Sequence, residues 1–478
     1  MRRLALAAAG LVLAALAGCN TIAPPPPLPA DAAISRPAAH APFLGASSAL
    51  VAQAEVPGDW WRLYDSPALD ALVAHALAAN TDLRAAGANL EKAQAGLDYA
   101  DAAREPSTSV YAAPSYGRRS AEEDLHPGKP FPNKFVYGTG LSVSWQVDLF
   151  GQIARGIAAA QDDVGAATAA RDAVRVTVVA ETTRAYLDAC ATGREIAVAD
   201  RLVALQQKST ELTRTLVANG RAGSIDTTRS SVQEDQVRAT LRQLDARRRL
   251  ALYRLAVLTG QTPSEFPRDV AACEQEPRLA APLPVGDGAG LLKRRPDVRR
   301  AEFEVQAASE RIGVVTADLY PKVSLGASIA SVGQLQRGFS DDTFKFSLGP
   351  LLTWEFPDRS RTRARIRAAD ADREIALARF DGTVLGALKE TESALEVYSE
   401  DARRRAILEA ARGKAADAAR DTERLFTLGR QGYLPVLDAN RTLIALEQST
   451  AAADSRLAAD QVDLFLALGG GWQDVPKP

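Results

Sequence analysis

Few side chains in this 478-residue sequence have the spacing that catalysis or metal binding requires. The three histidines, His40, His75 and His126, lie far apart and match neither a zinc site nor a catalytic triad. The glycine-rich run 286–290 lacks the spacing and the preceding strand of a dinucleotide-binding loop. No pair of carboxylates stands out as an acid and a base. We therefore expect no metal, no cofactor and no enzymatic activity.

The overall charge gives no sign of a nucleic-acid partner. The sequence has 57 Lys and Arg against 59 Asp and Glu, a formal net charge of -2. A nucleic-acid-binding protein usually carries a basic excess that neutralises phosphates. We therefore expect no nucleic acid among the partners.

The N-terminus carries the residues for one covalent modification. Arg2 and Arg3 precede the apolar run 4–17, which is too short for a stable transmembrane helix, and small residues lead to Cys19. Residues 16–19 resemble a bacterial lipobox, in which cleavage precedes the cysteine and the new N-terminus is acylated. Position 20, directly after the cysteine, is not Asp, and in this the sequence resembles lipoproteins that are sent to the outer membrane. The alternative is an ordinary signal peptide with an incidental cysteine.

Two further cysteines, Cys190 and Cys273, are candidates for a disulfide in an exported protein. Their pairing depends on geometry, so both the bonded and the free states stay open. The proline-rich segment after Cys19 cannot form a helix or a central strand and predicts an extended tether from the membrane to the folded body.

The remainder of the chain contains two copies of one plan. Residues 80–86 match residues 295–301 at an offset of 215, and Pro106 matches Pro321 at the same offset. Further along, Trp145 matches Trp354 and later positions match at an offset of 209. A register that changes only once, within the loop 118–134, favours duplication over chance.

Each copy contains a pair of predicted strands. Residues 343–354 alternate between large apolar and small or polar side chains, and residues 137–147 follow the same pattern. Their predicted partners are residues 107–117 and 322–333. Strands of roughly ten residues are long enough to cross a membrane, and the small polar face is typical of a wet barrel lumen. A soluble sandwich is the alternative.

Four strands are too few to close a barrel, and an open edge in lipid would leave backbone groups unpaired. Two copies of the chain would supply eight strands, whose interior side chains fill, whereas three would supply twelve and leave a channel. A homotrimer is therefore the smallest conducting assembly.

Very long helices follow the strands. Residues 151–219 and 360–428 contain no proline and few glycines, and apolar residues recur at threes and fours as in coiled-coil packing. Each helix ends at a glycine-containing turn, and a second helix returns over residues 226–259 or 435–468. We therefore predict two helical hairpins.

The sequence resembles the TolC-like outer-membrane efflux factors, in particular the NodT-type lipoprotein branch with OprM-like channels. The resemblance is carried by residues 145–151, 291–299, 429–441 and 467–472, and it covers nearly the whole chain in family order. Residues 356–358 depart from it, because relatives tend to have a leucine-rich turn with glycine at that point.

The resemblance implies a membrane α+β fold with internal duplication. In such a fold a homotrimeric twelve-stranded outer-membrane β-barrel, with four strands per chain, continues into a twelve-helix periplasmic α-barrel. The protein would be anchored in outer-membrane lipid and extend into the periplasm. It would form a passive conduit for drugs or other small molecules that an inner-membrane RND-type pump exports through a periplasmic adaptor. The runner-up is the conduit of a type I, ABC-driven protein secretion system. Two alternatives belong to other classes of function. One is a structural periplasmic coiled-coil lipoprotein, which would lack the paired strands, and the other is an enzyme.

Two sets of site residues follow from the resemblance. The adaptor-contact tips would be Gly220, Arg221, Ala222 and Gly223 in the first copy and Gly429, Arg430, Gln431 and Gly432 in the second. The periplasmic gate would be formed by Asp438, with Arg441 or Arg229 as its basic partner. The alternatives are plain helix caps at the turns and an ordinary surface ion pair at positions i and i+3.

The predicted domain organisation begins with a signal peptide over residues 1–18 and an acylated tether and equatorial segment over 19–65. The first efflux repeat spans 66–265, with a β-hairpin at 107–148 and a helical hairpin at 151–260. An equatorial linker covers 266–290. The second repeat spans 291–472, with hairpins at 322–356 and 360–468, before a tail at 473–478.

Overall fold

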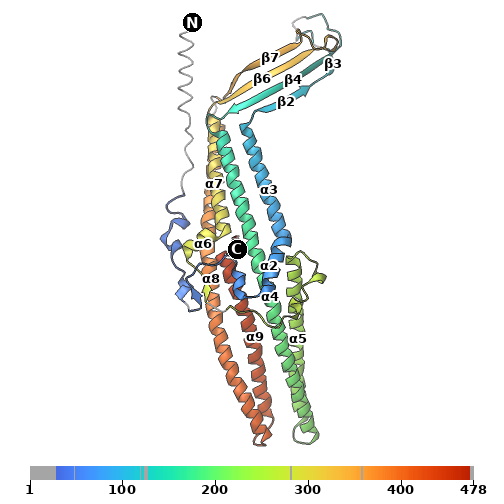
Figure 1. Ribbon diagram of the computed structural model, residues 1–478, viewed down its shortest axis with the longest axis vertical. Coiled ribbons are helices and arrows are strands. Elements are labelled where there is room, and N and C mark those ends of the chain that lie inside the picture. The colour runs from blue at the N-terminus through green and yellow to red at the C-terminus, as the bar shows by residue number, and fades with distance from the viewer. Residues whose placement is uncertain are drawn as a thin grey trace. The chain divides into compact units, whose positions relative to one another are not determined.

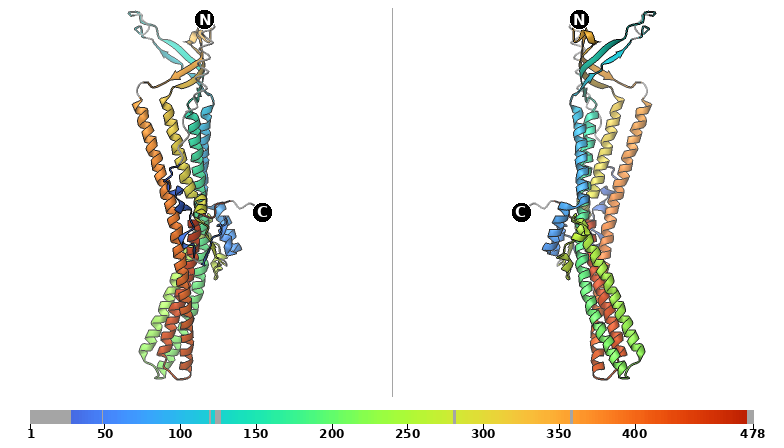
Figure 2. Two further views of the ribbon diagram at one scale, coloured as in Figure 1. Left: turned by 90° about the vertical axis from the view of Figure 1, so that its left-hand side faces the viewer. Right: turned by 90° about the vertical axis from the view of Figure 1, so that its right-hand side faces the viewer.

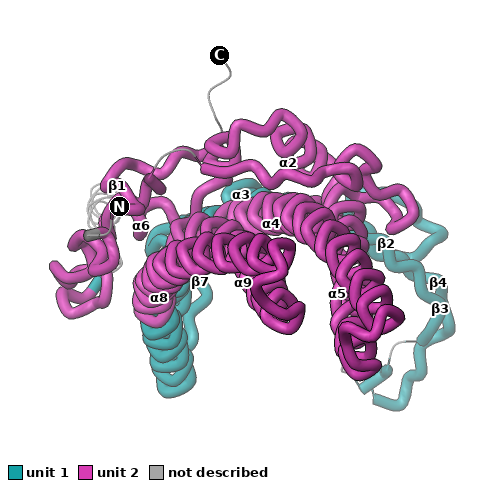
Figure 3. Tube along the Cα trace, turned by 90° about the horizontal axis from the view of Figure 1, so that it is seen from below, with its two compact units in different colours: residues 1–28, 90–167, 301–380 teal, residues 29–89, 168–300, 381–478 magenta. Residues whose placement is uncertain are grey.

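The computed structural model describes residues 28–47, 49–118, 120–122, 127–279, 282–356 and 359–473. The predicted signal peptide, Cys19, His126 and residues 474–478 of the tail lie outside this part of the chain. The described residues form two compact units (Figure 3). Unit 1 contains residues 90–167 and 301–380, and unit 2 contains residues 29–89, 168–300 and 381–473.

Unit 1 contains one antiparallel sheet (Figure 1). Its strands are β2 (Ser107–Ala112), β3 (Ser115–Gly117), β4 (Lys134–Val147), β6 (Lys322–Gln334) and β7 (Phe344–Thr353). The order is β2-β4-β6-β7, and β3 also pairs with β4. The predicted strand over residues 107–117 is thus split into two segments. It breaks at Pro114, which has no N–H to donate to the ladder.

Four helices contribute residues to both units: α3 (Thr81–Asp101), α4 (Gln152–Ala218), α7 (Pro296–Thr316) and α8 (Ser360–Thr427). Within unit 1, α7 packs against α4. The Arg155 guanidinium on α4 forms a 2.8 Å ion pair with Glu310 on α7, and a Cβ at Gly165 would lie 2.7 Å from the Phe303 ring. Glycine at position 165 therefore permits this close approach.

Unit 2 contains two helical hairpins, each ending in a tight turn (Figure 2). One is formed by α4 and α5 (Ser224–Leu258), and the other by α8 and α9 (Leu434–Leu468). The helices α4 and α8 have 67 and 68 residues, which correspond to about 100 Å at 1.5 Å per residue. No helix in the described part of the chain has the length and apolarity needed to cross a bilayer.

The main core of unit 2 lies where the N-terminal segment meets these helices. The Trp60 ring stacks on Phe465 of α9 with 4.6 Å between centroids, and both side chains are fully buried. The segment also contains α2 (Pro67–Ala79), and α6 (Gly288–Arg294) packs near it. A short parallel pair, β1 (Val51–Ala52) with β5 (Leu283–Pro284), joins the N-terminal segment to the linker.

Short 3₁₀ helices complete the chain: η1 (Ala33–Ser35), η2 (Pro37–His40), η3 (Leu44–Ser47), η4 (Trp60–Tyr64), η5 (Ala102–Arg104), η6 (Pro263–Glu265), η7 (Val270–Ala272), η8 (Ala317–Leu319) and η9 (Leu335–Arg337).

Equivalent residues of the two sequence copies make equivalent contacts. The indole N–H of Trp145 donates to the Arg104 carbonyl, and that of Trp354 donates to the Leu319 carbonyl. Asn80 donates to the Leu258 carbonyl at the end of α5, and Arg295 donates to the Ala467 carbonyl at the end of α9. The donors and acceptors keep the offsets of 209 and 215 seen in the sequence. These contacts support an origin by duplication.

Candidate functional site

The two faces of the sheet differ in chemistry. Ser109, Ser142, Ser328 and Ser347 stand opposite one another in a row across four strands, and the hydroxyls of the outer pairs lie 2.7 and 2.8 Å apart. The next row consists of Val110, Leu141, Ile329 and Phe346. Because neighbouring residues of a strand point to opposite faces, one face is small and polar and the other is apolar.

The apolar face is exposed in the single chain. Phe346 is 74% exposed and Leu348 is 82% exposed, and Val110 on the far strand is 76% exposed. Among the described strands, β2 and β7 stand at the two ends of the order, so each has a pairing partner on one side only. The sheet therefore offers an uncovered apolar surface and two edges with unpaired backbone groups.

The two hairpin tips are built alike. Gly220 and Gly429 have φ values of 70° and 67°, in the left-handed region that glycine adopts without strain. The N–H of Arg221 donates to the Leu216 carbonyl, and the N–H of Arg430 donates to the Leu425 carbonyl. These six-to-one bonds are the Schellman ending of a helix.

The residues at the two tips differ in their exposure and in their hydrogen bonds. Arg221 and Arg430 are exposed, as are Gly223 and Gly432, whereas Ala222 is half-buried. The Gln431 amide donates to the Thr422 carbonyl at 2.8 Å and so folds back onto α8. Each tip therefore presents one exposed arginine.

The predicted gate residues lie near the second tip. Asp438 and Arg441 are both exposed on α9, and their spacing of three places them on one helix face. Arg229 lies on α5, where its guanidinium is 3.7 Å from Asp226. Within the described chain, no ion pair joins Asp438 to Arg441 or to Arg229. The structure thus brings Arg229 to the carboxylate that caps α5 instead.

A link between the two hairpins was not predicted. The Tyr433 hydroxyl at the start of α9 lies 2.5 Å from the Ser209 hydroxyl on α4, and its ring contacts Phe426. The signal in the sequence was an aromatic residue directly after a tip turn, in a chain with only 6% aromatics.

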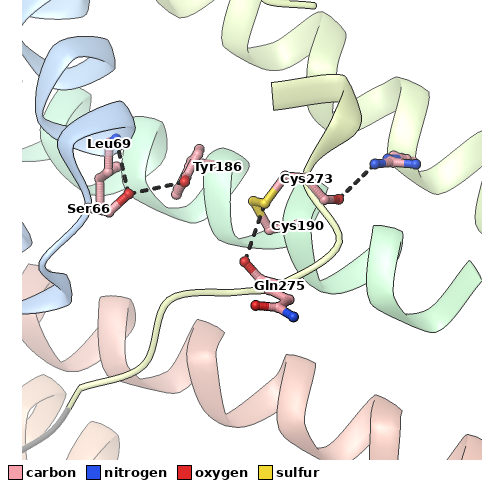
Figure 4. The surroundings of a disulfide bond; sticks show 7 residues. Ser66, Leu69, Tyr186, Cys190, Cys273 and Gln275 are labelled. Atoms are coloured by element: carbon pink, nitrogen blue, oxygen red, sulfur yellow. Dashed lines mark hydrogen bonds between the residues drawn. A yellow bond between two sulfur atoms is a disulfide. The ribbon is translucent and has the colours of Figure 1, made fainter. Parts of the chain in front are cut away.

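Cys190 and Cys273 form a disulfide in the structure, with their Cα atoms 4.9 Å apart (Figure 4). The bond joins the middle of α4 to the linker that leads toward α6. A close-lying ionic cluster around Asp454 was not predicted, because it involves segments far apart in the sequence. Among the described residues, no group of three or more His, Cys, Asp or Glu side chains is placed to hold a metal ion.

Comparison with known proteins identifies similar chains. The family model described as outer membrane efflux protein matches residues 72–261 and 290–470. Nodulation protein T of Rhizobium leguminosarum bv. trifolii is 26% identical over 426 residues, which cover 87% of this chain and 89% of that relative. Outer membrane protein OprJ of Pseudomonas aeruginosa is 28% identical over 482 residues, which cover 99% of this chain and 98% of the relative.

The fold is also similar to a solved structure. The outer-membrane channel OprN superposes with a TM-score of 0.86 at 30% sequence identity. The match covers 95% of this chain and 100% of that chain. Both the sequence and the fold therefore match over nearly the whole length.

Proposed function

The chain belongs to the outer membrane efflux protein family, and from that premise we propose that it is the outer-membrane channel of a tripartite efflux system. Three chains form a passive conduit for drugs or other small molecules, which an inner-membrane RND-type pump exports through a periplasmic adaptor. Cys19 carries the lipid anchor, and the helical hairpins extend into the periplasm.

The observation that carries this proposal is the two-faced sheet with open edges. An apolar face that is 74% exposed at Phe346 suits contact with lipid, and the serine row suits contact with water. Unpaired edges are costly in a membrane, so β7 of one chain is expected to pair with β2 of the next. Three chains would then close a barrel of twelve strands around a channel.

The tips are the proposed site of adaptor contact, and cross-linking tests it. A photoactivatable probe attached through Arg221→Cys should capture a periplasmic adaptor. The same probe at Arg242→Cys, an exposed position on α5 that is farther from the tip, should not. Recovery of an RND pump with the adaptor supports small-molecule efflux. Recovery of an ABC transporter supports protein secretion instead, and equal capture from both positions contradicts the tip assignment.

The gate is the second part of the proposal. Three Asp438 carboxylates around the trimer axis would repel anions and favour cations, and their pairing with basic residues would hold the tips together. We expect Asp438→Ala to raise single-channel conductance in planar bilayers several-fold, while Asp245→Ala, which changes a half-buried aspartate paired with Arg242 on the same helix α5, leaves it unchanged. Equal conductance of Asp438→Ala and the unmodified protein would contradict the gate assignment.

A further inference from the structure

A short segment of the linker is fastened across the hairpin helices; we name residues 273–278 the strap. At its start, Cys273 is bonded to Cys190, which is fully buried on α4 (Figure 4). The Arg248 guanidinium on α5 donates to the Cys273 carbonyl at 2.7 Å. A Cβ at Gly193 would lie 2.1 Å from that same carbonyl oxygen, so only glycine admits the strap this close to α4.

The end of the strap enters a buried ionic cluster on α9. Asp454 of α9 accepts hydrogen bonds from Arg194 of α4 at 2.6 Å, from Arg278 of the strap at 3.2 Å and from Arg405 of α8 at 2.7 Å. Arg194 also donates to Glu276 of the strap at 2.9 Å. One carboxylate thus joins α4, α8, α9 and the strap.

Asp454 stays ionised although it is buried in the protein. Burial by itself would raise the pKa of Asp454, but the hydrogen bonds from Arg405 and Arg194 outweigh burial and hold that pKa below its ordinary value. The Asp454 and Glu276 side chains are 5% and 4% exposed. Removing one member of such a cluster leaves buried charge uncompensated, which favours separation of the helices.

The packing of α9 changes at the level of this cluster. In the part from Thr450 to Leu468, twelve residues are buried, whereas only Val436 and Ile444 are buried between Leu434 and Ser449. Asp438 lies in the part that is mostly exposed in the single chain, sixteen residues before Asp454 and so about 24 Å away along the helix.

We propose that Asp454 and the disulfide-fastened strap are the pivot of α9. Residues 434–449, which include Asp438, move about this pivot when the tip opens. Asp454 is then a positioning residue, which acts on the channel through the lower part of α9. This inference rests on the proposed conduit function, since it assigns the fixed point of that conduit's gate.

Substitution at the pivot is the first test. Single-channel recordings of the full-length assembly compare the unmodified protein with three variants. Asp454→Asn changes the pivot, Asp438→Ala changes the gate, and Asp245→Asn is the control, a half-buried aspartate whose partner Arg242 lies on the same helix α5. We expect Asp454→Asn to raise the open probability about tenfold, as loss of a charge-assisted contact implies, and Asp245→Asn to leave it unchanged. If Asp438→Ala opens the channel and Asp454→Asn does not, the pivot is wrong and the gate stands.

Hydrogen exchange tests the pivot without relying on conductance. In Asp454→Asn, amides of residues 434–449 should exchange about tenfold faster, while those of 456–468 keep their rates. Faster exchange over the whole of α9 would mean general destabilisation and would overturn the pivot. If exchange changes as expected but no variant conducts, the conduit function fails and the mechanical pivot stands.

The disulfide gives a second perturbation that acts on the protein after it has folded. Adding a reductant to the unmodified channel should raise its open probability, and reoxidation should restore it. The double variant Cys190→Ser with Cys273→Ser should already show the raised value and should not respond to reductant. If the unmodified channel stays closed after its disulfide has been shown to be reduced, the strap has no role in the pivot.

Discussion

At the scale of single residues, a pair of neighbouring acids on α8 and α9 makes stability depend on pH. The Asp460 side chain is only 1% exposed, and the Arg456 guanidinium lies 3.0 Å from it. Burial, together with the neighbouring Asp401 carboxylate, raises the pKa of Asp460 to about 6. The protonated form is therefore favoured by folding, because Asp titrates near 3.9 in unfolded chains.

The sign of the pH effect follows from this shift. Stability from Asp460 is fully present below about pH 4 and is lost as the pH rises through about 6. We expect Asp460→Asn to match the unmodified protein at pH 4 and to be about 1 kcal/mol more stable at pH 7.5, because an amide does not ionise. Thermal unfolding of the purified protein at both pH values measures this.

The control for this prediction is Asp417→Asn, which changes an exposed acid paired with Arg420 on α8. Its stability difference should be small at both pH values. A gain for Asp460→Asn that is equal at pH 4 and pH 7.5 would mean that the titration of Asp460 is not the cause.

The sequence predicted residues whose roles depend on their neighbours in the chain. It did not predict residues whose partners lie far away in the chain. The tip glycines were predicted because a helix that turns back needs a left-handed residue, and Gly220 and Gly429 have that conformation. Asp454 was not predicted, because three arginines from three different segments select it among 59 acids. Sequence periodicity contains no information on such a meeting point.

At the scale of elements, the long helices follow from composition, since α4 and α8 contain no proline and end at glycine. The strands follow from alternation, except that Pro114 divides the first of them into β2 and β3. The β1–β5 pair and the 3₁₀ helices of the N-terminal segment were not predicted. They have two to five residues each, and such lengths are too short to show a period.

The strap gives a prediction at this scale. Gly193→Ala places a methyl group against the Cys273 carbonyl and should destabilise the protein by about 1–3 kcal/mol through overpacking. It should also increase the fraction of free Cys190 and Cys273 thiols. Thermal unfolding and thiol labelling followed by mass spectrometry measure the two effects.

Gly413→Ala is the matched control, because a Cβ at this helical glycine of α8 meets no atom within 4 Å. It should be stabilising by up to about 1 kcal/mol, since alanine favours helices more than glycine does. If the two substitutions behave alike, the close approach of the strap to α4 is not correct.

At the scale of the whole molecule, the sheet is incomplete in one chain. Its exposed apolar row and its two unpaired edges both require partners, which lipid and further copies of the chain would supply. Alternation in the sequence indicated the two faces. The number of chains that close the sheet depends on contacts that a single chain does not contain.

Neighbouring positions on β7 test the assignment of the two faces. Phe346→Lys puts a charge on the apolar face and should cost about 2–4 kcal/mol if that face meets lipid at mid-depth, so little assembled trimer should reach the outer membrane. Ser347→Lys puts the same charge on the polar face and should assemble. The amount of trimer in outer-membrane fractions measures both, and the opposite ranking would reverse the assignment.

The strap occurs between the two repeats and therefore once per chain, although the chain has two hairpins. In the proposed trimer, each strap would hold an α4–α5 hairpin by a covalent bond through Cys190 and an α8–α9 hairpin only by ion pairs through Asp454. At the level of the strap the two repeats are therefore not equivalent, and the symmetry of the proposed trimer there would be threefold. The α8–α9 hairpins and the α4–α5 hairpins then differ in mechanical compliance, so an opening motion would proceed as three alternating sectors rather than as a uniform widening.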